Sequence, residues 1–159
     1  RCNRYFFIEN PKEIKIENAP EQTCELKLHP EFKERGSRKF KTKDKFYITE
    51  KDFKEFKDGK LYRLMDCLNL KKIKNKFVFD SSDYEKYKKY GEKIIHWLPV
   101  QKDLVKVEVL MPNKEIKKGL AESMVNNLKV GDIVQFARFG FCKLDNKKSD
   151  KLVFWYTHD

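Results

Sequence analysis

Two strong hydrogen-bonding side chains stand in an apolar stretch near the end of the chain, "VGDIVQFARFGFCKLD", residues 130–145. Gln135 and Arg138 are surrounded there by residues such as Phe136 and Phe139. A glutamine amide and an arginine guanidinium can each make two parallel hydrogen bonds, a pairing that base edges accept. A guanidinium also fits a carboxylate in this way. The pair therefore has the chemistry of a recognition site.

The spacing of these two residues conflicts with a regular strand. Side chains alternate between the faces of a sheet, so residues three apart point to opposite sides. In a regular strand Gln135 and Arg138 could therefore not contact one ligand from the same face.

Arginine is scarce in this chain, with six arginines against thirty lysines. Arg4, Arg63 and Arg138 lie in or beside strand-like segments, which favours a surface that recognises base edges. Because guanidinium has a fork geometry that lysine lacks, each retained arginine is informative. A structural ion pair is an equal alternative for any single one of them.

A basic run, "KKIKNK", covers residues 71–76. As a strand it would place Lys72, Lys74 and Lys76 on one face, spaced to follow a phosphate backbone. The alternative is an edge strand that its lysines protect from aggregation. Several strand-like aromatic residues could stack on bases, although strand aromatics belong to the core more often; they are Tyr5, Phe7, Tyr62, Phe139 and Phe141.

Catalysis and metal binding find little support. His96 stands beside Trp97 in an apolar stretch, without a serine, cysteine or paired carboxylate placed to work with it, so a packing role is expected. No phosphate-binding GxxxxGK[ST] loop occurs. Four cysteines and three histidines are dispersed without a CxxC pair, so no metal is expected. Buried thiols in a reducing cytoplasm are the interpretation that we favour.

The overall composition indicates a globular domain that binds a polyanion. The 159 residues carry a net charge of +11, and 40% of them are hydrophobic. Such an excess of positive charge is typical of nucleic-acid binding, although a lysine- and glutamate-rich, heat-adapted surface is an alternative. The longest apolar runs are far too short to span a bilayer, so no membrane partner is expected. The sequence resembles part of a longer protein, without a signal pattern after its first residue.

The pattern along the chain predicts many short strands and little helix. Alternating segments such as "EIKIE" and "CELKLH" are typical of half-buried strands. Thr49 begins a predicted short helix that ends at Asp58-Gly59. Residues 82–91 are either a helix capped by Ser82 and Glu85 or an insert. A hairpin closes the chain, which indicates an all-β fold of antiparallel barrels or a sandwich.

Six segments together resemble a known family. They are "RYFFIENP", "HPEFKERGSR", "LYRLMD", "KIIHWLP", "GLAE" and "VGDIVQFARFGF". In this order they resemble the C-terminal anticodon-binding region of archaeal glutamyl-tRNA synthetases, within the class I glutamyl/glutaminyl-tRNA synthetase family. The resemblance extends from Arg4 to Phe154. The "IHW" and "QF-x-R-x-G-[FY]" elements are specific in combination, whereas each would be weak alone.

The resemblance implies an all-β fold of two small antiparallel β-barrels, proximal and distal, with one or two short helices. It also implies that the N-terminal strands are swapped between the barrels. The barrels are similar to the ribosomal protein family that binds five-S ribosomal RNA. On this basis we expect residues 1–92 to form the first anticodon-binding barrel and residues 93–159 the second.

The resemblance also assigns roles to individual residues. Arg4, Gln135 and Arg138 fall on the family's anticodon readers, and Arg4 is among the contacts to the middle base. Because the resemblance places Gln135 and Arg138 at one RNA loop, we expect a bulge or a strand end between them, near the small Ala137, that turns both side chains toward the RNA. The alternative is that the bases of the loop wrap around the strand and each face contacts a different base. Arg63 falls on a reader of the third base, in a segment where Lys60 and Tyr62 depart from the glutaminyl relatives. The wobble-base readers fall near Lys72 and Lys74. The expected anticodon-binding set is thus Arg4, Lys60, Arg63, Lys72, Lys74, Gln135 and Arg138, with Lys71 and Lys76 on the phosphate backbone.

The function implied by the resemblance is binding of the anticodon stem-loop of glutamate tRNA. The catalytic domain of the same enzyme, upstream in the chain, would use ATP with magnesium, whereas this part would need no cofactor. A monomeric, cytoplasmic enzyme is expected. The alternatives are the anticodon-binding domain of a glutaminyl-tRNA synthetase, a ribosomal-RNA-binding barrel protein and a protein-docking module.

Overall fold

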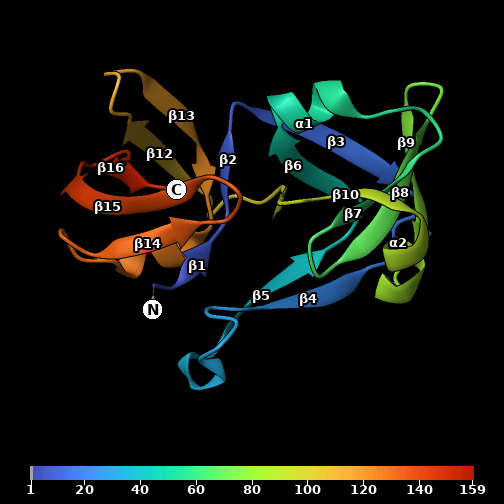
Figure 1. Cartoon of the computed structure of the whole chain (residues 1–159), viewed down its shortest axis with the longest axis horizontal. Coiled ribbons are helices and arrows are strands. Elements are labelled where there is room, and N and C mark those ends of the chain that lie inside the picture. Colours follow the sequence, from blue (N-terminus) through green and yellow to red (C-terminus); the bar gives the residue numbers. More distant parts are fainter. Residues whose placement is uncertain (1) are drawn as a thin grey trace. The chain divides into compact units, whose positions relative to one another are not determined.

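The computed structural model of the chain describes residues 2–159, and Arg1 lies outside the described residues. The chain folds into two compact units (Figure 1). The first unit contains the residues up to Pro11 together with Lys27–Arg38 and Gln101–Asp159, and the second contains Lys12–Leu26 and Lys39–Val100. Both are built mainly from curled β-sheets, which confirms the expected all-β, barrel-like fold. The expected boundary at residues 92 and 93 stays a prediction.

The first unit is a seven-stranded sheet. In spatial order its strands are β1 (Arg4–Tyr5), β14 (Ile133–Phe136), β15 (Gly140–Lys147), β16 (Leu152–His158), β12 (Val105–Leu110), β13 (Ile116–Ala121) and β2 (Phe7–Glu9). The 3-10 helices η1 (Lys33–Arg35) and η2 (Ser123–Asn127) belong to the same unit. The predicted C-terminal hairpin is confirmed by the antiparallel pairing of β15 with β16.

A sharp corner at Phe6 brings the edges of this sheet together. Strands β1 and β2 are separated only by Phe6, yet they pair with β14 and β13 at opposite ends of the strand order. The chain therefore passes directly from one edge to the other, and the sheet curls into a barrel-like form. Gly119 permits the close approach of β13 to β2, because a Cβ at this position would lie 1.9 Å from the carbonyl oxygen of Ile8.

A buried ion pair satisfies the backbone at this corner. The N–H of Phe6 donates a hydrogen bond of 2.6 Å to Oε2 of Glu122, which directly follows β13. The guanidinium of Arg38 donates to both oxygens of the same carboxylate, at 2.8 and 3.2 Å, and to the carbonyl of Lys27 at 2.8 Å. Burial raises the pKa of the Glu122 carboxyl, and the Arg38 guanidinium and the Phe6 N–H act against that rise.

The interior of the first unit consists of apolar side chains from all seven strands and the segments beside them. Phe136 lies at its centre, with ring centroids of Phe7 and Phe154 at 5.3 and 5.0 Å. The other buried members are Tyr5, Leu28, Val107, Val109, Ala121, Val125, Leu128, Val134, Cys142, Leu144 and Leu152. Burial raises the pKa of the Cys142 thiol to about 12, so this cysteine behaves as an apolar core residue.

The second unit contains another seven-stranded sheet. Its spatial order is β10 (Gly91–Ile95), β7 (Leu61–Leu64), β8 (Leu68–Ile73), β9 (Lys76–Ser81), β3 (Pro11–Glu17), β6 (Lys45–Thr49) and β11 (Leu98–Pro99). A separate two-stranded ribbon consists of β4 (Gln22–Lys27) and β5 (Ser37–Thr42).

The second sheet has a corner at His96 and Trp97, where the chain passes from one edge of the sheet to the other. These two buried residues separate β10 from β11, which stand at opposite edges of the strand order. The indole N–H of Trp97 donates to the carbonyl of Met65 at 2.9 Å, and its ring packs against Phe40 and Phe46. The expected packing role of both residues is confirmed.

Two short helices accompany this sheet. Helix α1 (Glu50–Glu55) begins where predicted, since the hydroxyl of Thr49 accepts the N–H of Asp52 at 3.0 Å. Helix α2 (Tyr84–Tyr90) has Gly91 as its C-terminal cap, as predicted, but its N-terminal cap is Asp83 rather than Ser82. Among the described residues, no helix is long and apolar enough to cross a membrane.

Replacing Glu122 by Gln should reduce the stability of the chain strongly. Gln keeps the size of the side chain but leaves the buried Arg38 charge without a counter-ion, a change that costs about 3–5 kcal/mol. Urea denaturation measures the loss. As a control, Glu108→Gln removes a partly exposed ion pair with Lys151, which should cost about 1 kcal/mol or less. Equal losses for the two variants would show that the corner does not depend on the buried pair.

Candidate nucleic-acid interface

Arg4 and Gln135 form a recognition pair on neighbouring parallel strands. They are direct partners in the pairing of β1 with β14, and Nε of Arg4 donates to Oε1 of Gln135 at 2.8 Å. Backbone bonds fix this register, because the N–H groups of Gln135 and Ala137 donate to the carbonyls of Asn3 and Tyr5 at 2.9 and 3.0 Å. Arg4 is exposed and Gln135 is half-buried. Hydrogen-bonding groups of both side chains are thus presented at one edge of the first sheet.

Arg138 lies in a turn that begins immediately after the recognition pair. Strand β14 ends at Phe136, and the N–H of Phe139 donates to the carbonyl of Phe136 at 2.9 Å. Arg138 adopts a φ of 60° and its side chain is exposed. The predicted strand end near Ala137 is confirmed, so the alternation of faces does not apply to Arg138. A common ligand for Gln135 and Arg138 stays a prediction.

The turn leads into a glycine that its surroundings require. Gly140 has a φ of 147°, and a Cβ there would lie 2.5 Å from the ring of Tyr156 and 3.0 Å from the carbonyl oxygen of His158. A side chain at this position would push the turn away from β16. The glycine of the "F-G-F" motif is therefore required for the turn that positions Arg138.

Arg35 is a residue near this site that the sequence analysis did not select. Its guanidinium donates to Oδ1 of Asn3 at 3.1 Å, one residue before Arg4. The same guanidinium lies 5.1 Å from the centre of the Phe32 ring, and that ring lies 4.7 Å from the ring of His29. The preference for arginines in strand-like segments excluded Arg35, which lies in a 3-10 helix.

A second group, the lysine turn, consists of Lys60, Lys72 and Lys74. The N–H of Gly59 donates to the carbonyl of Lys72 at 2.8 Å, and the N–H of Lys74 donates to Oδ1 of Asp58 at 3.2 Å. These bonds hold the loop before β7 against the turn between β8 and β9. Within residues 2–159, the structure shows no ion pair from any of the three ammonium groups. The lysine turn can therefore receive an anionic ligand.

The structure corrects the expected row of lysines. The chain reverses at Lys74 and Asn75, which have φ values of 49° and 68°. Lys72 pairs with the buried Phe77, and Ile73 pairs with Lys76. Lys72, Lys74 and Lys76 therefore do not follow one strand, because a hairpin turn with left-handed residues divides the run.

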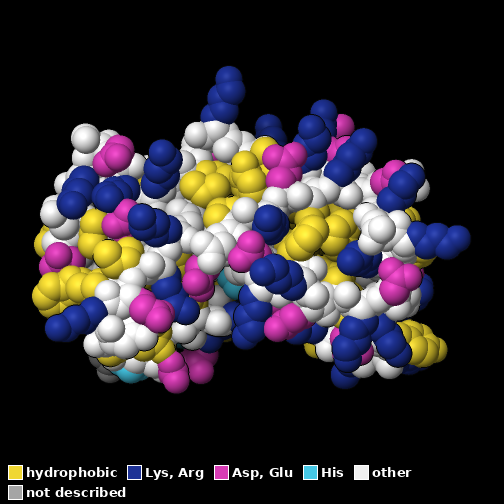
Figure 2. Space-filling model, turned by 90° about the horizontal axis from the view of Figure 1, so that it is seen from above, with side chains coloured by type: hydrophobic (Ala, Val, Ile, Leu, Met, Phe, Trp, Pro, Cys, Tyr) yellow, Lys and Arg dark blue, Asp and Glu magenta, His cyan; other side chains and the backbone are white. Residues whose placement is uncertain are grey.

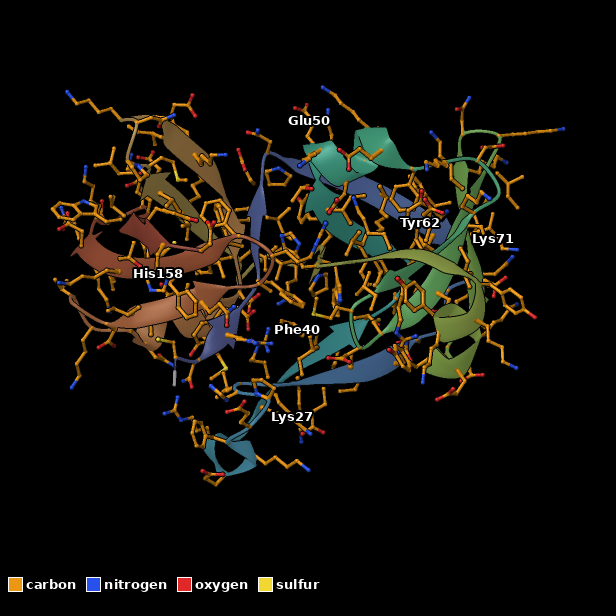
Figure 3. The ribbon with its side chains drawn as sticks, viewed as in Figure 1. Lys27, Phe40, Glu50, Tyr62, Lys71 and His158 are labelled. Atoms are coloured by element: carbon orange, nitrogen blue, oxygen red, sulfur yellow. The ribbon has the colours of Figure 1, made fainter. Side chains whose placement is uncertain are left out.

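The two lysines expected on the phosphate backbone have acidic neighbours. Lys71 lies 3.8 Å from Asp80, which also binds Lys86 at 2.7 Å. Burial acts to raise the pKa of the Asp80 carboxyl, but hydrogen bonds and the nearby lysines outweigh it and lower the pKa. Lys76 is 3.9 Å from Glu17. Lys71 lies on β8, where it is paired with Leu61 of β7 (Figure 3). Phosphate contact by either lysine stays a prediction.

Arg63 is buried within the second unit. Its Nη1 donates to Oδ1 of Asn69 at 3.0 Å and to the carbonyl of Ser82 at 3.2 Å. Its guanidinium also lies 5.6 Å from the centre of the Tyr84 ring, on α2. The structure therefore gives Arg63 internal partners that hold α2, and its expected contact with the third base stays a prediction.

The aromatic candidates separate by burial. Tyr5, Phe7 and Tyr62 are buried, and Phe139 packs against the core with its ring 5.2 Å from that of Phe7. Phe141 is half-buried on the outward side of β15. Tyr5, Phe7, Tyr62 and Phe139 therefore belong to the core, which leaves Phe141 as the candidate for stacking on a base.

The described residues are rich in basic side chains. Among residues 2–159, no group of three or more His, Cys, Asp or Glu could hold a metal ion. Lys and Arg side chains are spread over the face drawn in Figure 2, with acidic side chains between them. Cys24, Cys67 and Cys142 are buried free thiols. An all-β chain with a net charge of +11 and outward Arg, Gln and Lys donors has the features of an RNA-binding domain.

Comparison with known proteins defines the family. The family model described as "tRNA synthetases class I (E and Q), anti-codon binding domain" matches residues 2–90, and a second model with the same description matches residues 94–145. The chain therefore belongs to the anticodon-binding domains of these class I tRNA synthetases. This result confirms the resemblance found in the sequence motifs.

Curated relatives support the same assignment. The chain is 40% identical over 161 residues to the glutamate–tRNA ligase of Methanocaldococcus jannaschii and 39% identical over 159 residues to that of Methanobrevibacter smithii. It is 38% identical over 166 residues to the glutamate–tRNA ligase of Pyrococcus furiosus. Each comparison covers 99% of this chain but only 28% of the relative. The chain therefore spans little more than a quarter of the length of these relatives.

The left-handed backbone at Arg138 predicts an unusual order of stabilities. Arg138→Gly should be more stable than Arg138→Ala by about 1 kcal/mol, because only glycine adopts a positive φ without strain. Urea denaturation measures the difference.

Lys143 supplies the matched control for this comparison. It is exposed in β15 and is not among the residues with positive φ. At this position Lys143→Gly should be less stable than Lys143→Ala, because glycine weakens a strand interior. The same order at both positions would contradict the turn geometry.

Proposed function

We propose that this chain is the anticodon-binding part of a glutamate–tRNA ligase and that it binds the anticodon loop of glutamate tRNA. The observation that carries the proposal is the recognition pair followed by the Arg138 turn, in a chain of the anticodon-binding family. The names of the relatives favour glutamate over glutamine. Unpaired loop bases are the part of an RNA whose edges side chains can read.

The proposed division of labour follows from the geometry of the donors. Arg4, Gln135 and Arg138 supply directional hydrogen bonds for base identity, and each good bidentate contact contributes about 1–3 kcal/mol of discrimination. Lysine is a flexible point charge, so the lysine turn supplies phosphate contacts that weaken with salt. Lys71 and Lys76 add phosphate contacts at the same hairpin, and Arg63 contacts the third anticodon base.

The rest of the ligase would carry the chemistry. In this proposal an upstream catalytic domain of the same chain binds ATP with magnesium, activates glutamate and transfers it to the tRNA. The enzyme is a cytoplasmic monomer, and the present residues contribute binding and no catalytic group. Anticodon binding selects the tRNA that the catalytic domain then charges.

Single-base variants of the tRNA test this proposal. Fluorescence anisotropy should show that this chain prefers glutamate tRNA with its own middle anticodon base over transcripts with that base replaced. The expected loss is about 5- to 150-fold, which corresponds to the discrimination of one bidentate contact. Equal affinity for all middle bases would refute anticodon reading.

A pair of variants tests the division of labour. Arg138→Ala should reduce the preference between tRNA variants, whereas Lys74→Ala should weaken all of them alike and lower the salt slope by about 0.7 to 1. Lys114→Ala is the control, because Lys114 is also an exposed turn lysine with positive φ. It should leave binding unchanged. If Lys74→Ala alters base preference and Arg138→Ala does not, the two roles are assigned wrongly.

A further inference from the structure

The recognition pair is the beginning of a longer line of side chains. Gln135 is paired with Phe141 of β15, and Phe141 is paired with His158 of β16. Directly paired residues of neighbouring strands place their side chains on the same face of a sheet. Arg4, Gln135, Phe141 and His158 therefore follow one another across strands β1, β14, β15 and β16, which Figure 1 shows in this order.

Phe141 and His158 form a stacked ring pair at the end of this line. Their ring centroids are 4.6 Å apart and their planes differ by 28°. Phe141 is half-buried, and His158 is exposed near the C-terminal end of β16 (Figure 3). A pair of stacked rings on an outward face is an aromatic surface beside hydrogen-bonding side chains. Surfaces of this kind hold unpaired bases in RNA-binding proteins.

An irregularity in the β15–β16 pairing creates the ring pair. Phe141 is paired with His158 but the next residue, Cys142, is paired with Tyr156. Thr157 is thereby left out of the register, and its hydroxyl donates to the carbonyl of Phe141 at 2.9 Å. In a regular ladder Phe141 would face Thr157 instead. The extra residue replaces a hydroxyl by an imidazole ring beside Phe141, as bulges do when they redirect a side chain.

We propose that the ring pair Phe141–His158 is a stacking site for an unpaired nucleobase next to the base bound by Arg4 and Gln135. This inference rests on the proposed function, because it places the base in the same RNA loop. Stacking contributes affinity with little sequence preference, whereas the recognition pair contributes identity. A splayed loop thus has one base bonded at its edge and a neighbouring base held by its face.

The next row of the sheet provides a control on the same face. Trp155 is 50% exposed and paired with Lys143, which is paired with Ile133. Lys143 is two residues along β15 from Phe141, a distance of about 7 Å in a strand. Trp155 is therefore an exposed aromatic residue close to the ring pair but outside the proposed stacking site.

The test uses the glutamate tRNA anticodon stem-loop with 2-aminopurine placed at each loop position in turn. Stacking quenches the fluorescence of this base analogue. Binding of the unaltered chain should quench it at one position beside the middle base. Phe141→Leu should abolish that quench and weaken binding by about 5- to 150-fold. Phe141→Trp and His158→Phe should keep the quench, and Trp155→Ala should leave both readouts unchanged.

The outcomes distinguish this inference from the proposed function. Thermal unfolding shows whether the Phe141→Leu variant is folded. If the folded variant binds normally and keeps the quench, Phe141 is a packing residue and the stacking site is refuted. Loss of the quench with Trp155→Ala instead would move the base to the next row and also refute it. If the unaltered chain has no middle-base preference but Phe141→Leu still loses the quench, the stacking site stands and anticodon reading fails.

Discussion

The bond from the Phe6 N–H to Glu122 is the interaction on which the first unit depends. A sheet that closes on itself needs a corner, and at a corner a backbone donor leaves the ladder. Glu122 accepts this donor at 2.6 Å, and Arg38 supplies the opposite charge that a buried carboxylate requires. The same guanidinium binds the Lys27 carbonyl at the end of β4. One ion pair therefore connects the corner, the end of β13 and the Lys27 carbonyl within the first unit.

The two units solve the same closure problem with different residues. In the first, the corner residue Phe6 uses a carboxylate from elsewhere in the chain. In the second, the indole N–H of the corner residue Trp97 donates to the Met65 carbonyl, and His96 is buried beside it. Both corners place large side chains inside, which leaves the outward faces free for polar residues. The recognition pair and the lysine turn occupy these outward positions in the two units.

The sequence predicted the features that depend on local chemistry and missed those that depend on distant pairing. Thr49 was predictable because a cap acts over three residues, and the strand end near Ala137 because the family motif places Gln135 and Arg138 at one RNA loop. The turn at Lys74-Asn75 was not, since neither residue is glycine and both have positive φ. The Arg38–Glu122 pair joins residues 84 positions apart. The ring pair depends on a register shift that no local pattern records.

The Phe6 corner also links recognition to local unfolding. The acceptors for the Gln135 and Ala137 amides are the carbonyls of Asn3 and Tyr5, within a few residues of the corner. Detachment of β1 would therefore expose both amides to deuterium exchange and release Arg4 from Gln135 in the same event. Exchange protection at these two amides reports how often the recognition pair is assembled in solution. The free-energy cost of opening the corner is thus also the free-energy margin that keeps the pair ready for its ligand.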